Sequence, residues 1–441
     1  MIPSHGHVSG SPAHDAIAIA ASLPFLPAFV SDNRLAMNTS LPAYQATPAP
    51  TLTGAEPRGA AITRLTLTSF RSYGRLRLDA DRRPVVLTGA NGAGKTNLLE
   101  ALSFLAPGRG LRGVKLAEAG QAPIGTTTGA PWAVAATMDA GEGDIELASG
   151  LDPAKPERRL VRVNGTAAKG AAALGRELGV IWLTPAMDRL FVDSPGGRRR
   201  FLDRLVIAFD PDHAGRTAAY ERATRQRARL LKDRAFLDQA WCAALEDIMA
   251  RYGVALAAAR RDLVNRLNAE LAAKTGPFPV ARLALIGAVD RWLTEMPAVD
   301  AEDALRDALR DERRQTPGDV PAAGPHRSDL AAHMVAPSQA SNGQAAALCS
   351  TGEQKALLIS ILLATARLQQ LKRGAAPLLL LDEVAAHLDA DRRAALFHEI
   401  RALGAQAWMT GTDAALFAAF GADAQFFTVD RGQIAPAANL H

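Results

Sequence analysis

Short apolar runs, glycine-rich turns and helical segments alternate along the chain and predict a mixed α/β fold. Strand patterns cover Ile62–Thr68 and Pro84–Thr88, and the second of these enters a glycine-rich turn. Helical spacing follows over Thr96–Leu105, which gives the order strand, loop, helix. Between Trp132 and Val163, short apolar runs broken by Gly and Asp predict an antiparallel β subdomain.

The pattern changes near Arg200, where long segments rich in Ala, Leu and Arg take over. These segments extend from Phe201 to about Lys274 and break at Asp210-Pro211-Asp212. Because no heptad seam is sustained, the pattern favours a compact helical lobe over a long coiled coil. Beyond the lobe, the pattern predicts a strand, a long helix and a continuous apolar strand, at Val280–Ile286, Gly352 to about Leu371, and Pro377–Leu381.

Composition adds limits to this picture. The chain has 441 residues, 48% of them hydrophobic and 22% charged, which is enough for a full core and for two to three domains. The formal net charge of +5 permits anionic partners without proving one. Cys242 and Cys349 are the two cysteines, and they form neither a disulfide framework nor a metal motif. A reducing compartment, the cytoplasm, is therefore expected.

The first sixty residues differ from the rest, and we expect residues 1–60 to be a disordered or misassigned extension. The apolar run Ala16–Val30 is interrupted by Pro24 and Pro27 and is too short to span a bilayer. No Lys or Arg precedes Ala16, which argues against a signal peptide. No other stretch is a candidate membrane span, so no membrane partner is expected.

The glycine-rich turn fits the phosphate-loop pattern G-x-x-x-x-G-K-[ST] in full. Its glycines let backbone N–H groups converge on phosphate oxygens, while Lys95 would reach the β- and γ-phosphates and Thr96 would bind Mg²⁺. The strand before the loop and the helix after it make a chance glycine turn the weaker interpretation. The predicted nucleotide-binding residues here are Gly89, Ala90, Asn91, Gly92, Ala93, Gly94, Lys95, Thr96 and Asn97.

A second element matches this loop, because the apolar strand Leu378–Leu381 runs directly into Asp382 and Glu383. Two carboxylates at the end of a buried strand are costly unless a cation or a reacting water uses them. We predict that Asp382 holds Mg²⁺ together with Thr96. Glu383 would polarise the attacking water, so Glu383 and Lys95 are the predicted catalytic residues.

The third element is Cys349-Ser350-Thr351-Gly352-Glu353-Gln354, just before the long predicted helix. Taken alone, it would be an ordinary helix cap, with a Ser followed three residues later by a Glu. Between a phosphate loop and an acidic strand, it resembles the signature sequence of ABC ATPases. In that class Ser350 and Gly352 would present a helix N-terminus to the γ-phosphate of a partner subunit. The expected state is a homodimer closed around two ATP molecules.

The spacing of these motifs separates the ABC relatives. Lys95 and Ser350 lie 255 positions apart, further than in a transporter ATPase and far closer than in an SMC protein with its long coiled coil. Both an SMC-like structural clamp and an ABC transporter subunit are therefore kept as alternatives that the spacing disfavours.

Several further segments make the resemblance specific. They are Phe70-Arg71-Ser72-Tyr73, Asn91 through Glu100, Gly108-Arg109 with Arg112, Pro195 through Asp203, and Gly324-Pro325-His326-Arg327. With the motifs above, they identify the chain as similar to the RecF family from about residue 61 onward. The family's usual Gln is replaced by Glu353, and its usual Asp by Ser328.

This resemblance implies an ABC-type ATPase head with a flanking β subdomain and an inserted helical lobe. The implied segments are 61–195 for the first part of the head, 196–275 for the lobe and 276–441 for the rest. It further implies a weak DNA-stimulated ATPase that uses ATP and Mg²⁺. Such a protein would bind double-stranded and gapped DNA at single-strand/double-strand junctions and act in DNA repair, replication and the SOS response. It would help RecR and RecO load RecA.

A run of arginines is the candidate DNA contact. Planar guanidinium groups suit phosphate backbones, although a solvated and salt-bridged helix face would give the same pattern. The candidates are Arg198, Arg199 and Arg200.

Overall fold

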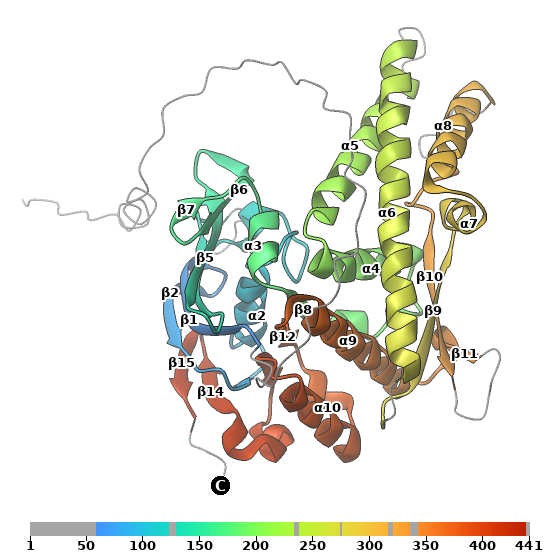
Figure 1. Ribbon diagram of the computed structural model, residues 1–441. Coiled ribbons are helices and arrows are strands. Elements are labelled where there is room, and N and C mark those ends of the chain that lie inside the picture. The colour runs from blue at the N-terminus through green and yellow to red at the C-terminus, as the bar shows by residue number, and fades with distance from the viewer. Residues whose placement is uncertain are drawn as a thin grey trace, which may run out of the picture. The chain divides into compact units, whose positions relative to one another are not determined.

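The computed structural model describes residues 59–122, 129–232, 238–273, 276–315, 321–335 and 343–437. The extension expected over residues 1–60 lies outside the described residues, except for its last two positions. Figure 1 shows an α/β body beside a group of long helices.

The central element is a six-stranded sheet in the order β15-β14-β3-β13-β12-β8. Its strands pair in parallel except for the edge strand β15. Strands β3, β8, β12 and β13 are buried along their whole length, as expected for parallel strands covered on both faces. The bounds are β3 Val85–Thr88, β8 Val180–Leu183, β12 Leu378–Leu381, β13 Ala407–Gly411, β14 Gln425–Asp430 and β15 Gln433–Pro436.

Three helices follow strands of this sheet or carry its motifs: α2 (Lys95–Ser103), α9 (Thr351–Arg373) and α10 (Ala390–Ala402). Helix α2 packs against β12 and β13, and α9 packs against β8. Short 3-10 turns at Leu116–Ala119, Pro185–Met187, Ala346–Leu348, Val384–His387 and Ala414–Asp423 complete the connections.

A second six-stranded sheet, in the order β2-β1-β4-β5-β6-β7, is antiparallel throughout. Strand β4 alternates buried and half-buried residues, the pattern of a sheet with one face on the core. This confirms the antiparallel subdomain predicted between Trp132 and Val163. The bounds are β1 Ala61–Phe70, β2 Tyr73–Asp79, β4 Ala133–Asp139, β5 Asp144–Asp152, β6 Lys155–Val163 and β7 Thr166–Ala167, with α3 at Ala172–Glu177.

Helices α4, α5, α6, α7 and α8 form a group beside the head, and a three-stranded sheet in the order β11-β10-β9 lies at the base of this group (Figure 1). The bounds are α4 Pro195–Phe209, α5 His213–Lys232, α6 Gln239–Ala273, α7 Ala288–Glu295, α8 Ala298–Gln315, β9 Val280–Ile286, β10 Asp329–Val335 and β11 Gln344–Ala345. The predicted break at Asp210-Pro211-Asp212 separates α4 from α5, and the predicted strand at Val280–Ile286 is β9.

Packing divides the lobe differently from the sequence pattern, which ended it at residue 275. A small separate core includes Tyr220, Met249, Val289 and Leu305, so α7 and α8 join α5 and α6 in one unit. Helix α4 and the C-terminal half of α6 belong instead to the large core of the head, through side chains such as Leu205. The contacts that decide this division join residues far apart in the chain and leave no local signal.

An ion pair is buried where α5, α6 and α8 meet. Arg227 Nε donates to Glu246 at 2.9 Å, and its terminal nitrogen donates to the Leu309 carbonyl at 2.7 Å. Both side chains are almost completely excluded from solvent. Such a pair is costly to desolvate, but it is costlier still to leave one charge without its partner.

We expect Glu246→Gln to lower the free energy of unfolding by about 3 kcal/mol, because Arg227 would stay buried without a counter-charge. Urea unfolding followed by circular dichroism measures the change. The matched control is Glu221→Gln on α5, whose ion pair with Arg225 is exposed to solvent. The control should cost less than about 1 kcal/mol, and equal losses for the two variants would contradict the role of burial.

Candidate nucleotide site

The loop at residues 89–94 connects β3 to α2, and its backbone admits only glycine at two positions. Gly89 has φ 146°, and a Cβ there would lie 2.1 Å from the Val429 carbonyl oxygen. Gly94 has φ 117° and packs against the side chains of Ser72 and Tyr73. A side chain at either position would force the chain out of this turn. The loop therefore has the tight curvature that a phosphate cradle requires.

Lys95 begins α2 and is buried beneath this loop. Its ammonium group donates to the carbonyls of Gly89 at 2.6 Å and Ala90 at 2.9 Å. Burial lowers the pKa of Lys95, and the nearby charges of Glu383 and Asp382 oppose that shift. The ammonium group is thus held inside the loop, close to where the loop's N–H groups would receive phosphate oxygens.

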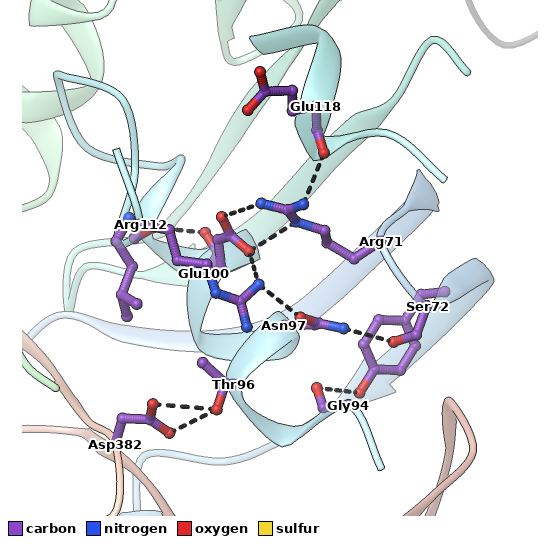
Figure 2. A network of polar contacts seen from close by, with 12 residues as sticks. Arg71, Ser72, Gly94, Thr96, Asn97, Glu100, Arg112, Glu118 and Asp382 are labelled. Atoms are coloured by element: carbon purple, nitrogen blue, oxygen red, sulfur yellow. Dashed lines mark hydrogen bonds and ion pairs between the residues drawn. The ribbon is translucent and has the colours of Figure 1, made fainter. Parts of the chain in front are cut away.

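The acidic strand end lies against the same loop. The Thr96 hydroxyl donates to the two carboxylate oxygens of Asp382, at 3.0 and 3.1 Å, across 286 positions of sequence (Figure 2). Asp382 is nearly buried. A hydroxyl and a carboxylate are the hard oxygen ligands that Mg²⁺ prefers, so these two residues fit the ion predicted for them.

Thr410 at the end of β13 was not found by sequence reasoning. Its hydroxyl donates to Asp382 at 2.7 Å and accepts the backbone N–H of Glu383 at 2.9 Å. One buried side chain thus orients both acidic residues. The sequence offers no local signal for this role, because Thr410 becomes their neighbour only through the parallel pairing of β12 with β13.

Glu383 has an unusual backbone conformation, with φ 49° and ψ 32° in the left-handed region. A residue with a Cβ pays about 1–3 kcal/mol to remain there, so the surrounding contacts must hold it. The half-buried Glu383 leads directly into the turn Val384–His387. Strain of this kind collects at functional sites and agrees with a special role for Glu383.

A buried carboxylate organises the other side of the loop (Figure 2). Glu100 on α2 is fully buried and accepts two bonds from Arg71, at 2.8 and 2.9 Å, and one from Arg112 at 2.6 Å. Arg112 also donates to Asn97, whose amide donates to Ser72 at 3.0 Å. Three of the segments that carried the family resemblance therefore meet at one carboxylate beside the phosphate loop.

The signature residues form the start of α9. The Ser350 hydroxyl accepts the N–H of Glu353, and the Glu353 carboxylate accepts the N–H of Ser350 at 2.8 Å, which is a complete capping box. These bonds from Ser350 lower the pKa of Glu353. Gly352 has open space around its Cα. In Figure 1 the end of α9 next to β11 lies apart from α2.

The three candidate arginines have different surroundings. Arg198 makes two bonds to Asp329, at 2.7 and 2.9 Å, and further bonds to the carbonyls that precede α4. Arg199 donates to the Ser328 carbonyl at 2.8 Å, whereas Arg200 is exposed. The structure thus gives Arg198 a role in joining α4 to β10, and Arg200 is the most accessible of the three.

Comparison with known proteins places this geometry in context. A family model described as "AAA domain, putative AbiEii toxin, Type IV TA system" matches residues 85–155, which include the phosphate loop. A curated protein from Mesorhizobium japonicum, "DNA replication and repair protein RecF", is 47% identical over 384 residues, covering 86% of this chain and 99% of the relative. A protein of the same description from Rhizobium rhizogenes is 48% identical over 383 residues, with 86% and 99% covered.

Two solved structures share the fold. One, described as the recombination mediator protein RecF with ATPrS in the RecFOR pathway, has a TM-score of 0.72 at 19% identity, covering 86% of this chain and 99% of the other. The corresponding structure with ATP has a TM-score of 0.69 at 20% identity, with the same coverage. At these identities the likeness concerns the fold alone. Within the part of the chain that the structure describes, no helix has both the length and the apolar character needed to cross a membrane.

We expect Thr410→Val to weaken nucleotide binding in a Mg²⁺-dependent way, because Asp382 would lose a fixed partner and the Glu383 N–H would lose its acceptor. An unsatisfied buried N–H costs about 1–3 kcal/mol, so stability should fall as well. Titration of a fluorescent ATP analogue at several Mg²⁺ concentrations measures the effect. Thr410→Ser keeps the hydroxyl and should behave like the unaltered protein. Equal Mg²⁺ dependence in the Val and Ser variants would rule out this role.

Proposed function

This chain belongs to the RecF family of DNA replication and repair proteins, and we propose that it is an ATPase that binds DNA when ATP closes two copies into a dimer. The observation that carries the proposal is the contact between Thr96 and Asp382, which brings the phosphate loop and the acidic strand end together. Such an assembly serves nucleoside triphosphate binding and hydrolysis.

The chain's own groups divide the chemistry as follows. The loop N–H groups and Lys95 bind the phosphates, and the Glu383 carboxylate accepts a proton from the attacking water. Mg²⁺, held by Thr96 and Asp382 when bound, supplies positive charge to the phosphate oxygens. ATP binding closes the dimer and slow hydrolysis reopens it, so the nucleotide acts as a conformational switch.

The signature supports a composite site. Ser350 uses its hydroxyl as an acceptor within its own helix turn, and its O–H remains able to donate outward. The N-terminal end of the 23-residue helix α9 also favours negative charge. We infer that Ser350 and Gly352 meet the γ-phosphate bound by a second copy. Each nucleotide site would then need both subunits.

Family membership supports the finer proposals. The protein acts at single-strand/double-strand junctions of gapped DNA, with hydrolysis stimulated by DNA, and helps RecR and RecO load RecA. It works in the cytoplasm. An SMC-like clamp and a transporter subunit are the weaker alternatives, because the inserted lobe is compact and the identity to curated RecF proteins extends over 86% of the chain.

Ser350→Arg should leave ATP binding to the monomer nearly normal and block ATP-dependent dimerisation. The larger side chain would fill the space that the nucleotide of the second copy needs next to Ser350. Glu383→Gln should instead let ATP-bound dimers accumulate, since it keeps the side-chain shape but weakens water activation. Sedimentation velocity with ATP, combined with a fluorescent-nucleotide titration, separates the two effects.

The control for this pair is Leu371→Arg at the opposite end of α9, where the side chain is 63% exposed. This variant should dimerise normally. If Ser350→Arg destroys nucleotide binding in the isolated monomer, the signature serves its own subunit and the composite site is wrong.

DNA affinity should fall steeply with salt, because contacts to phosphates release counterions at a log–log slope near −0.9 per contact. Replacing the exposed Arg200 by Ala should reduce that slope by about 1. Fluorescence anisotropy with a gapped duplex at several salt concentrations measures it. Arg200→Lys keeps the charge and should retain the slope. If the slope is unchanged in the Ala variant, Arg200 does not contact DNA phosphates and DNA binds to another surface.

A further inference from the structure

Lys355 directly follows the signature, in the first turns of α9, and its side chain is buried. Its side chain is 3% exposed. The ammonium group donates to the backbone carbonyl of Glu383 at 3.4 Å and lies 3.6 Å from the Asp188 carboxylate. Burying an ammonium group is costly unless hydrogen bonds and a counter-charge compensate for the lost hydration.

The carbonyl that Lys355 contacts belongs to the residue with the left-handed backbone. At φ 49° a residue with a Cβ stays in place only if its neighbours hold it. The Glu383 N–H donates to the Thr410 hydroxyl at 2.9 Å, and the Glu383 carbonyl accepts from Lys355 and from the Ala386 N–H, each at 3.4 Å. Because the peptide groups on both sides of the Glu383 Cα are hydrogen-bonded, the orientation of its Cα–Cβ bond is fixed, and with it the direction of the carboxylate.

A purely structural role for Lys355 would be to neutralise Asp188. The Asp188 side chain is 27% exposed, yet its oxygen Oδ1 is buried and makes no hydrogen bond to any described residue. The carboxylate therefore relies on Lys355 as its counter-charge and helps to hold the ammonium group in place. Neutralising Asp188 would not by itself require a contact with Glu383, however, and the bond to its carbonyl connects Lys355 directly to the proposed catalytic residue.

We propose that Lys355 is a positioning residue that holds the Glu383 backbone in its hydrolysis-competent conformation and couples it to the signature turn. The same rigid end of α9 carries Ser350 and Lys355. Docking of a partner's nucleotide on Ser350 therefore acts on the element that fixes Glu383 in the same subunit. Each subunit thereby adjusts its own hydrolysis to the nucleotide that its partner has bound. This inference rests on the proposed function.

The test compares Lys355→Met, which keeps the length of the side chain without its charge, with Lys355→Arg. Each is assayed for nucleotide affinity of the monomer, ATP-dependent dimer fraction, and kcat and KM for ATP hydrolysis. For Lys355→Met we expect kcat to fall about tenfold, while KM, affinity and dimer fraction stay within about twofold. Lys355→Arg should recover most of kcat, because a guanidinium group can donate to the same carbonyl and carboxylate.

The coupling has its own readout in the dependence of hydrolysis rate on ATP concentration. The unaltered protein should show a Hill coefficient above one, and Lys355→Met should lower it to one. Loss of folding alone would not produce this change at unaltered affinity. If kcat per folded molecule is unchanged in Lys355→Met, or if kcat and affinity fall together, the positioning role is wrong.

Two further variants make the outcome decisive. Should Lys355→Met fail to fold, Asp188→Asn takes its place, because it removes the carboxylate that pairs with Lys355. We expect a smaller fall in kcat at unaltered nucleotide affinity, and an unchanged kcat in Asp188→Asn overturns the proposal. Glu383→Gln is measured alongside. If it hydrolyses ATP normally, the proposed role of Glu383 has failed. If it is inactive while Lys355→Met is fully active, the inference about Lys355 alone has failed.

Discussion

The parallel pairing of β3, β13 and β12 is the constraint on which the site depends. Because parallel strands end at the same edge of a sheet, the loop after β3 and the acids after β12 meet there, and Thr96 bonds to Asp382 across 286 positions. Thr410 is the second-last residue of β13 and bridges the two acidic residues. A one-residue slip between these strands would separate the loop from its acids, so the site depends on their register as well as on their order.

Buried ion pairs connect parts of the molecule that are distant in sequence. Glu100 joins three segments around the phosphate loop through Arg71 and Arg112, and Arg227 with Glu246 joins helices of the lobe. Each ion pair loses hydration when it is buried, and only well-placed hydrogen bonds compensate for that loss. Such contacts favour one arrangement, because a segment that moved would leave a buried charge without its partner. In this chain they occur where segments distant in sequence must keep a fixed relation, beside the nucleotide site and between the long helices.

The site is divided between a buried and an exposed part. Lys95 and Asp382 are buried and hydrogen-bonded within the head, whereas Ser350 is exposed at the start of α9 and Gly352 has open space beside it. Under the proposed function, a nucleotide held by the buried part would leave its γ-phosphate available to a second copy. Binding could then precede closure, and closure could precede hydrolysis.

The sequence by itself determined the strand-loop-helix context of the phosphate loop, the acidic end of β12, the capping signature of α9 and the antiparallel β subdomain. Each of these features depends on residues that are close together in the chain, so their spacing forms a recognisable sequence pattern. Only the tertiary structure decided that Thr410 and Lys355 hold Glu383, that Arg198 pairs with Asp329, and that α7 and α8 belong to the helical lobe. These relations arise from the packing of distant segments, and side chains that become neighbours in this way carry no local pattern.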